Sequence, residues 1–279
     1  MNENIKNELP VDDEKDTEKL EEIRDRIAKC DVEIADALSR RMYCVQEIIE
    51  YKKKHGMVIF QGDQEKKQRR VLAERIQGHP FEDAIKDIYQ EIIKNSRIVQ
   101  ADALFSYNIM LIGFMGAGKT TVADYLSHML EMEEVDTDEM IVNWRGMSIN
   151  EIFARFGEEY FRDLETSTLK ALAGCRQLIV SCGGGVPLRQ DNIDIMRSRG
   201  VIVWLTATPE TIYDRVHLST TRPLLNGNNS VEGIERLLKE RLPRYENAAD
   251  VIVPTDGLTI HEVCELLVKR VLEYKSRQK

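Results

Sequence analysis

Residues 113–120 read Gly-Phe-Met-Gly-Ala-Gly-Lys-Thr, which matches the phosphate-binding loop pattern G-x-x-x-x-G-K-[ST]. A short apolar run, Tyr107–Ile112, precedes this loop, and residues 122–130 follow it with helical spacing. Strand, glycine loop and helix are the context that the pattern requires. Because backbone N–H groups in such a loop close around phosphate oxygens, the stretch predicts a nucleotide-binding α/β domain.

The loop also assigns individual roles. The ammonium of Lys119 is expected to neutralise the β- and γ-phosphates of ATP, and the Thr120 hydroxyl is expected to ligate Mg²⁺. The ATP-binding residues expected from the loop are Gly116, Ala117, Gly118, Lys119, Thr120 and Thr121.

Short apolar segments continue beyond the loop and alternate with helical stretches. They cover residues 109–112, 177–181, 201–206 and 250–253. This alternation is typical of a parallel sheet with crossover helices, and it predicts an α/β domain over residues 107–279.

The first part of the chain has a different pattern. Residues 1–16 are polar and charge-rich, so we expect them to be disordered. Residues 17–55 contain no Gly or Pro and carry apolar side chains at spacings of three and four, which predicts one long helix. Two shorter helices are expected over residues 63–77 and 81–104, which gives an all-α domain of three helices over residues 17–104. A 39-residue helix is ~58 Å long and cannot bury its apolar face alone, so we expect a homodimer.

The amino-acid composition limits the classes of binding partner and the cellular location expected for the protein. The net charge is −9, with 19 Lys/Arg against 23 Asp/Glu in residues 1–104 and 20 against 25 in the remainder. Since neither half is basic, the charge argues against nucleic acid or an anionic membrane as partner. Five cysteines without a C-x-x-C pair fit reduced thiols in a cytoplasmic protein, and no apolar run is long enough to span a bilayer.

Charged and glycine-rich segments of the second half suggest a kinase acting on a small hydroxylated substrate. Asp136 and Asp138, spaced by two residues at an expected strand end, would point to the same side, the first toward Mg²⁺ and the second toward a substrate hydroxyl. Taken singly, these acids fit helix caps equally well, and Arg162 and Arg241 fit surface ion pairs. A loop with Arg222 and the run Asn226-Gly227-Asn228-Asn229 has the composition of a mobile lid.

Six motifs occur in the order G-F-M-G-A-G-K-T, D-T-D, F-R-D-L-E, C-G-G-G, R-P-L-L and R-x-P-x-Y-E-x-x-A-D. In this order they resemble the shikimate kinase family. The resemblance implies a nucleoside-monophosphate-kinase-like fold and ATP-dependent phosphorylation of the 3-hydroxyl of shikimate. It implies that Asp138 binds the substrate hydroxyls and acts as base, and that Arg162 and Arg241 bind the substrate carboxylate. It implies that the substrate site is lined by Gly183, Gly184 and Gly185. It also implies that Arg222 reaches the transferred phosphoryl group from the lid and that Arg215 lies at the adenine. The alternative is another small-molecule P-loop kinase, of the gluconate type.

Polar residues interrupt the apolar faces of the first half. Arg41 and Lys52 differ by ~20° in direction and ~16 Å along the helix axis, so their side chains could converge on one small dianion. Taken alone, the two residues are better explained by snorkelling to the surface or by a structural ion pair. Ser96 and Gln100 are i, i+4 neighbours on the third helix. Arg24 lies ~25 Å from Arg41 along the same helix, so a functional Arg24 would serve a site in a second chain.

Together these residues resemble the all-helical chorismate mutase family. The resemblance implies an intertwined dimer that converts chorismate to prephenate, with Arg24 crossing to the partner's site. It implies that Arg24 and Arg41 bind carboxylates, that Lys52 and Gln100 contact the ether oxygen, and that Glu65 and Ser96 bind the hydroxyl. Gln61 and Gln64 stand where the family usually has Asp and Arg. The sequence therefore indicates a bifunctional fusion of aromatic amino-acid biosynthesis; the alternative is a kinase with a non-catalytic helical module for dimerisation or effector binding.

Overall fold

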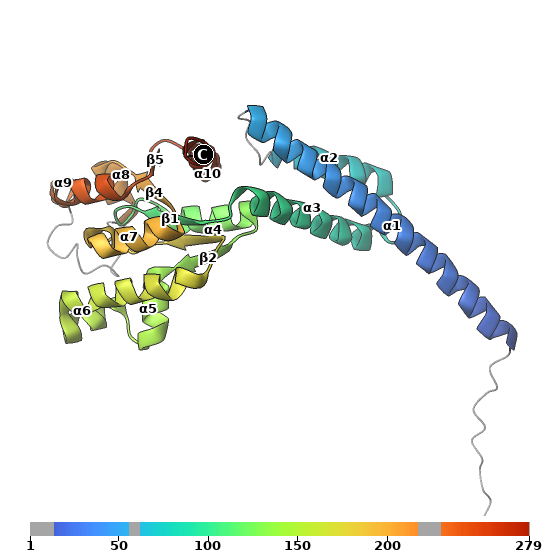
Figure 1. The fold of residues 1–279 in the computed structure, drawn as a ribbon, viewed down its shortest axis with the longest axis horizontal. Helices are drawn as coiled ribbons and strands as arrows, with labels where there is room; N and C mark the ends of the chain where they lie inside the picture. The colour runs from blue at the N-terminus through green and yellow to red at the C-terminus, as the bar shows by residue number, and fades with distance from the viewer. Residues whose placement is uncertain (1–13, 56–61, 217–229, 279) are drawn as a thin grey trace, which may run out of the picture. The chain divides into compact units, whose positions relative to one another are not determined.

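The structure, a computed structural model, describes residues 14–55, 62–216 and 230–278 (Figure 1). Its backbone contacts form two compact units, Met1–Tyr51 and Lys52–Lys279. Three predictions lie outside the described residues: disorder over residues 1–13, the substitution at Gln61, and the lid with Arg222.

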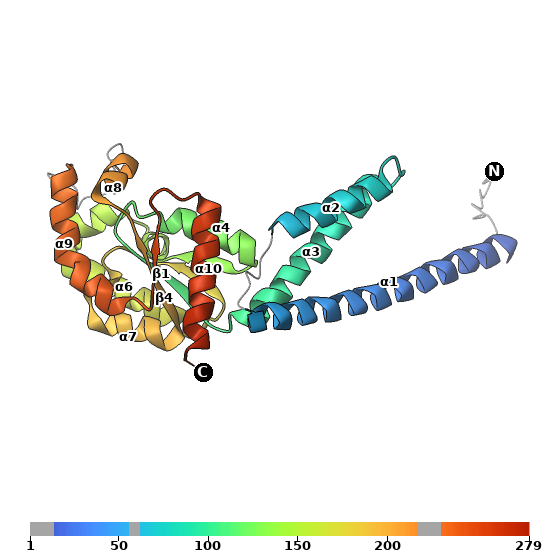
Figure 2. The same ribbon diagram turned by 90° about the horizontal axis from the view of Figure 1, so that it is seen from above.

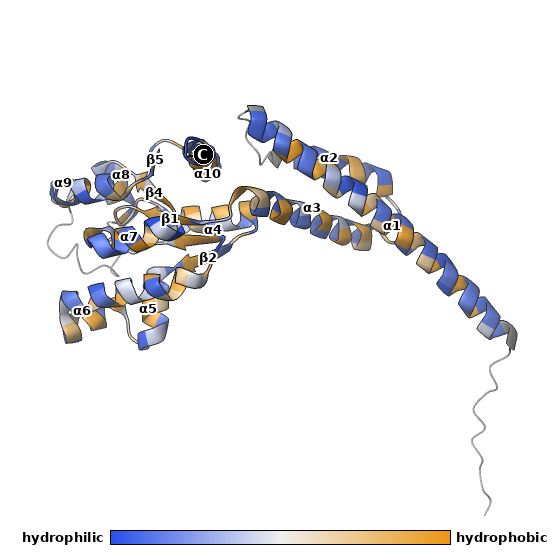
Figure 3. Cartoon of the chain, viewed as in Figure 1, coloured by the Kyte–Doolittle hydropathy of each residue, from blue (hydrophilic) through white to orange (hydrophobic). Residues whose placement is uncertain are grey.

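The long first helix is confirmed as α1, Glu14–His55. It begins before Thr17, so the prediction of disorder is wrong for residues 14–16. Residues 14–16 contain no Gly or Pro, so the helix can extend to Glu14. Hydrophobic and hydrophilic residues alternate along α1 (Figure 3), and several of its large apolar side chains are about half exposed, namely Leu20, Ile23, Ile27 and Ile34.

The other two predicted helices are confirmed as α2, Gly62–Ile76, and α3, Glu82–Leu104. They pack against each other. The turn between them ends where the Glu82 carboxylate accepts a hydrogen bond of 2.8 Å from the Gly78 backbone N–H. Buried residues of α3 include Ile93, Ser96 and Leu104, so Ser96 is a polar residue on the packed face of its helix.

Within the described residues, five parallel strands form one sheet in the order β2-β3-β1-β4-β5. Their bounds are Asn108–Ile112 for β1, Glu133–Asp136 for β2, Leu178–Ser181 for β3, Gly200–Thr206 for β4 and Val251–Pro254 for β5. The four strands predicted from apolar runs are confirmed. β2 was not among them, because this edge strand reads Glu-Glu-Val-Asp and contains no apolar run.

Helices cover both faces of this sheet: α4 and α10 pack on one face and α7 on the other (Figure 2). The helix bounds are Lys119–Leu130 for α4, Thr137–Arg145 for α5, Ile149–Ala171 for α6, Gln190–Arg199 for α7, Pro209–Val216 for α8, Val231–Ala248 for α9 and Ile260–Ser276 for α10, with single 3₁₀ turns at Leu172–Gly174 and Val186–Leu188. The predicted α/β fold with a parallel sheet is therefore confirmed.

The central strand β1 positions the phosphate-binding loop. All five of its residues are buried, as expected for a strand covered on both faces. β1 ends at Ile112, so the loop begins at the carboxyl edge of the sheet, with the carboxyl end of β3 beside it. Ligands of open α/β sheets bind at this edge, where the strand order changes direction. Among the described helices, none has both the length and the apolar character needed to cross a membrane.

Candidate active sites

The phosphate-binding loop ends at the N-terminus of α4. Gly118 is the N-cap residue and has a φ of 93°, a left-handed conformation that a side chain would strain. The Lys119 ammonium is buried and donates hydrogen bonds to the carbonyl oxygens of Gly113 at 2.9 Å and Phe114 at 3.1 Å. A cation and the first N–H groups of a helix therefore meet at the carboxyl end of β1, which is a site suited to phosphate oxygens.

Asp136 is the last residue of β2 and the N-cap of α5. One of its carboxylate oxygens accepts from the backbone N–H of Asp138 at 2.9 Å. The other accepts from the Ser181 hydroxyl at 2.9 Å and from the Thr120 hydroxyl at 3.4 Å. The helix-cap reading is thus correct for Asp136, and the carboxylate also faces the loop hydroxyl expected to ligate Mg²⁺. A carboxylate and a hydroxyl side by side are the hard oxygen ligands that Mg²⁺ prefers.

The argument from strand alternation for Asp136 and Asp138 is wrong. The strand ends at Asp136 and α5 begins at Thr137, so the first helical turn sets the direction of the Asp138 side chain. Both carboxylates nevertheless line the same cleft.

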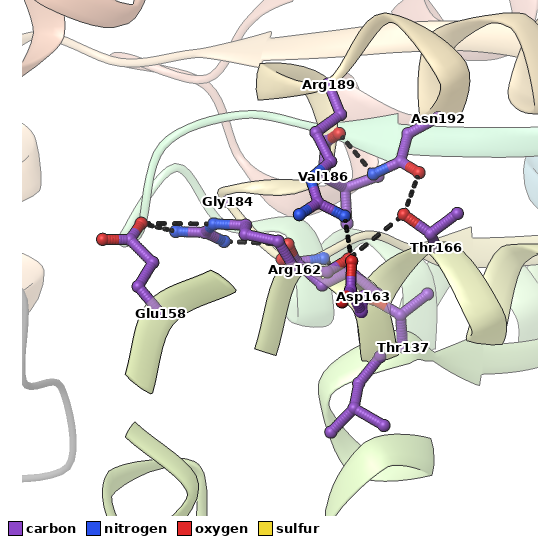
Figure 4. Close-up of polar contacts among 12 residues, drawn as sticks. Thr137, Glu158, Arg162, Asp163, Thr166, Gly184, Val186, Arg189 and Asn192 are labelled. Carbon is purple, nitrogen blue, oxygen red and sulfur yellow. Dashed lines mark hydrogen bonds and ion pairs between the residues drawn. The ribbon is translucent and has the colours of Figure 1, made fainter. Parts of the chain in front are cut away.

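Arg162 and Glu165 form a buried ion pair on α6 (Figure 4 shows Arg162 and its second partner, Glu158). The guanidinium donates to Glu165 at 2.8 Å and to Glu158 at 2.7 and 3.2 Å, and Arg162 is 6% exposed. Arg162 is therefore not a surface ion-pair partner. Burial raises the pKa of Glu165 to about 7; Arg162 acts in the opposite direction, and the negative charge of Asp138 adds to the rise.

The glycine run after β3 brings backbone close to these side chains. A Cβ atom on Gly185 would overlap the Arg162 guanidinium, so only glycine leaves that space open. The Gly183 N–H donates to the Thr137 hydroxyl at 2.9 Å, and the Gly184 carbonyl accepts from the Tyr245 hydroxyl at 2.7 Å. These bonds fix the run between α5 and α9.

Two further arginines reach the same region. Arg241 of α9 lies with its guanidinium carbon 5.4 Å from the centroid of the Phe114 ring. Its Nη1 is buried and has no hydrogen-bond partner among the described residues. A buried guanidinium donor of this kind fits an anionic ligand, because an unsatisfied donor costs free energy. Arg215 of α8 donates to the Gly116 carbonyl at 3.0 Å and to the Thr255 hydroxyl at 3.2 Å, beside the loop.

These groups surround one cleft of about 760 Å³. The predicted residues that line it are Gly116, Gly118, Lys119, Thr120, Thr121, Asp136, Asp138, Arg162, Gly184, Gly185, Arg215 and Arg241. Ala117 and Gly183 are buried and do not line it. The cleft also contains Glu165 and Ser181, to which the sequence assigned no role. Two features of the sequence could have indicated these residues. Glu165 is an acid three residues after Arg162 on a helix, and Ser181 carries a hydroxyl at the end of a buried strand.

The helical region gathers some of the residues expected for the second site. Lys52, at the end of α1, is half-buried; burial lowers its pKa, and the negative charge of Glu65 opposes this. Glu65 of α2 accepts two hydrogen bonds from Arg97 of α3, at 3.1 and 2.5 Å. Ser96 is buried and donates to the Ile92 carbonyl at 2.8 Å.

The other residues expected in this second site differ in exposure. Gln100 is half-buried, and Gln64 is exposed. In the first unit, Arg24 is exposed and Arg41 is half-buried on α1.

Comparison with known proteins assigns the helical region and the α/β region to two different families. The family model for shikimate kinase matches residues 115–272, and the model for chorismate mutase type II matches residues 23–101. The shikimate kinase of Thermodesulfovibrio yellowstonii is 43% identical over 162 residues, which cover 58% of this chain and 93% of the relative. That of Dehalococcoides mccartyi is 40% identical over 169 residues, covering 61% and 96%.

The α/β region is also similar to a solved shikimate kinase structure. Shikimate kinase from Acinetobacter baumannii, in complex with shikimate, superposes with a TM-score of 0.60 at 32% identity and covers 63% of this chain and 98% of that one. The predicted fusion of two families is confirmed. This chain belongs to the shikimate kinase family and carries a chorismate mutase type II domain ahead of the kinase.

Proposed function

We propose that this chain phosphorylates the 3-hydroxyl of shikimate with ATP and rearranges chorismate to prephenate. The observation that carries the kinase proposal is the cleft in which the Lys119 ammonium, the Asp138 carboxylate and the Arg162 guanidinium meet. The match to the chorismate mutase family carries the second activity. The gluconate-type alternative for the kinase has no comparable support, because the family match is to shikimate kinase.

Phosphoryl transfer requires an aligned hydroxyl and neutralised phosphate charge. In the proposal, backbone N–H groups of the loop bind the phosphates, and Lys119 exchanges its two carbonyl acceptors for phosphate oxygens. Asp138 binds the substrate hydroxyl and accepts its proton. Thr120 and Asp136 would hold Mg²⁺, which supplies additional neutralisation of the phosphates when bound; their hydroxyl and carboxylate oxygens, 3.4 Å apart, fit such an ion. Arg215 would lie at the adenine, and Arg222 would approach the transferred phosphoryl group.

The substrate carboxylate would be bound by Arg162 and Arg241. Both guanidinium groups line the cleft, and the buried donor of Arg241 has no acceptor among the described residues. Gly183, Gly184 and Gly185 would lie along the substrate ring. A carboxylate held by two arginines on one side and hydroxyls held by Asp138 on the other fix the orientation of a small polyol acid.

The mutase reaction is pericyclic and needs neither a nucleophile nor a metal. In the proposal, Arg24 of the partner chain and Arg41 bind the two carboxylates of chorismate. Lys52 and Gln100 stabilise the charge that develops on the ether oxygen. Glu65 and Ser96 bind the hydroxyl.

The assembly proposed for this site is a homodimer formed through the helical domain of residues 17–104. Support comes from α1, whose large apolar side chains are exposed along much of its length. The kinase domain would span residues 107–279. A cytoplasmic location is the corresponding proposal, since both substrates and ATP belong to intracellular biosynthesis.

The kinase proposal is tested by ADP formation with shikimate, Mg²⁺ and purified protein, with gluconate as the control acceptor. We expect shikimate-dependent ADP formation that Asp138→Asn removes, while binding of ATP persists. Equal rates with gluconate, or an Asp138→Asn variant with full activity, would contradict the assigned roles.

A further inference from the structure

Arg97 of α3 forms hydrogen bonds both to α2 of the chorismate mutase-like region and to α4 of the kinase region. Its side chain is 24% exposed. The Nε and Nη2 groups donate to the two carboxylate oxygens of Glu65 at 3.1 and 2.5 Å. The remaining nitrogen, Nη1, donates to the Glu131 carboxylate at 3.3 Å and to the His128 carbonyl at 3.4 Å. All three guanidinium nitrogens are therefore used, one side on α2 and the other on α4.

The two hydrogen bonds from Arg97 fix the orientation of the Glu65 carboxylate in addition to pairing its charge. Two parallel N–H···O bonds from one planar guanidinium hold both oxygens of a carboxylate in a defined plane, which a single point charge cannot do. The other cations that face Glu65 are Arg69 on its own helix, at 3.9 Å, and Lys52 at the end of α1. Arg97 makes two hydrogen bonds to the Glu65 carboxylate, whereas the Arg69 contact is a single ion pair at 3.9 Å.

The opposite side of Arg97 is held by the kinase segment. His128 and Glu131 lie at the C-terminal end of α4, where Glu131 is the C-cap residue in a left-handed conformation, with φ 53°. A cation at a helix C-terminus is favourable because it faces the last carbonyl groups. The first residue of this same helix is Lys119 of the phosphate-binding loop. The support of Arg97 is thus built into the nucleotide-binding helix.

We propose that Arg97 is a positioning residue for the mutase reaction, holding the Glu65 carboxylate toward the substrate hydroxyl while the kinase residues Glu131 and His128 hold Arg97. The inference rests on the proposed mutase function of Glu65. It means that the kinase segment completes the support of the mutase site, so mutase activity depends on a contact with α4 of the kinase segment.

The test uses the full chain with Arg97→Ala and Arg97→Lys, and Arg69→Ala as matched control, because Arg69 faces the same carboxylate without a short contact. Mutase kcat and KM are measured, and shikimate kinase activity reports folding. We expect Arg97→Ala to lower mutase kcat/KM about tenfold or more. Arg97→Lys keeps a cation beside Glu65 but loses the two-point contact, so it should restore only part of the rate. Arg69→Ala should behave like the unmodified chain.

A second variant addresses the kinase side. Glu131→Gln keeps the size of the side chain and removes the ion pair, so mutase kcat/KM should fall several-fold and kinase activity should persist. It also decides the question if Arg97→Ala fails to fold.

Several outcomes would overturn the inference. Unchanged mutase activity in Arg97→Ala, or an Arg97→Lys variant that is no more active than Arg97→Ala, would exclude the positioning role while leaving the mutase proposal standing. Unchanged mutase activity in Glu131→Gln would exclude the support from the kinase segment. Absence of chorismate turnover by the unmodified chain would overturn the mutase proposal and this inference together.

Discussion

Replacement of Arg162 by lysine tests the carboxylate-binding role most sharply. The guanidinium makes three hydrogen bonds to two acids, Glu158 and Glu165, and is 6% exposed. Lysine keeps the charge and loses the planar fork, so it cannot bind a carboxylate at two points. The loss of one charge-assisted hydrogen bond corresponds to about 1.5–3 kcal/mol, or about 10- to 150-fold in affinity.

The assay is steady-state ADP formation with shikimate and ATP varied separately. KM for shikimate should rise by that factor in Arg162→Lys, and KM for ATP should stay within about twofold. The matched control is Arg189→Lys. Arg189 also forms ion pairs with two acids of α6, Glu159 and Asp163, but it does not line the cleft (Figure 4 shows Arg189 with Asp163).

Two results would refute the reasoning. If KM for shikimate is unchanged in Arg162→Lys, Arg162 has only a structural role. If Arg189→Lys raises KM for shikimate equally, the effect belongs to the stability of α6 and not to contact with the substrate.

Three further predictions follow from the same structure. Lys119→Ala should abolish phosphorylation and leave chorismate turnover intact; loss of both activities would mean coupled domains or misfolding. The folded-state pKa of Glu165, about 7, lies above its usual value of 4.5, so the folded protein keeps a proton that the unfolded chain releases between these values. The free energy of unfolding should therefore fall by about 3 kcal/mol as the pH rises through this window. Chemical denaturation from pH 4.5 to 8 should show this slope in the unmodified chain, and the slope should be reduced in Glu165→Gln; identical slopes would contradict it. Light scattering at micromolar concentration should give the mass of a dimer, and a monomeric mass would exclude both the dimer and the role of Arg24 in the partner's site.

The sequence predicted the elements whose patterns are local. The phosphate-binding loop, the long helix without Gly or Pro, and four buried strands have local signals of spacing or apolar character. β2 was expected only as a strand end at Asp136 and was not among the apolar runs, because a short edge strand with acids at Glu133 and Glu134 has no such signal. Asp136 is both the last residue of β2 and the N-cap of α5. The direction of the Asp138 side chain therefore follows from the first turn of α5 and not from alternation along a strand.

Tertiary contacts account for what the sequence could not predict in the sites. Glu165 is the last residue of the F-R-D-L-E motif, but its burial against Arg162 depends on the packing of α6. Arg97 has no motif at all; its partners are 32 and 34 residues away, on α2 and at the end of α4. Contacts of this kind depend on the fold and cannot be read from spacing along one helix.

The central claim is that one chain carries two activities, and it is tested most directly by chorismate disappearance with the purified full-length protein beside its Arg41→Ala variant. Shikimate-dependent ADP formation is measured in the same preparations. The account predicts that the unmodified chain performs both reactions, and that Arg41→Ala removes chorismate turnover alone. An active kinase with no chorismate turnover would contradict the account, and the helical region would then be a non-catalytic module for dimerisation or effector binding.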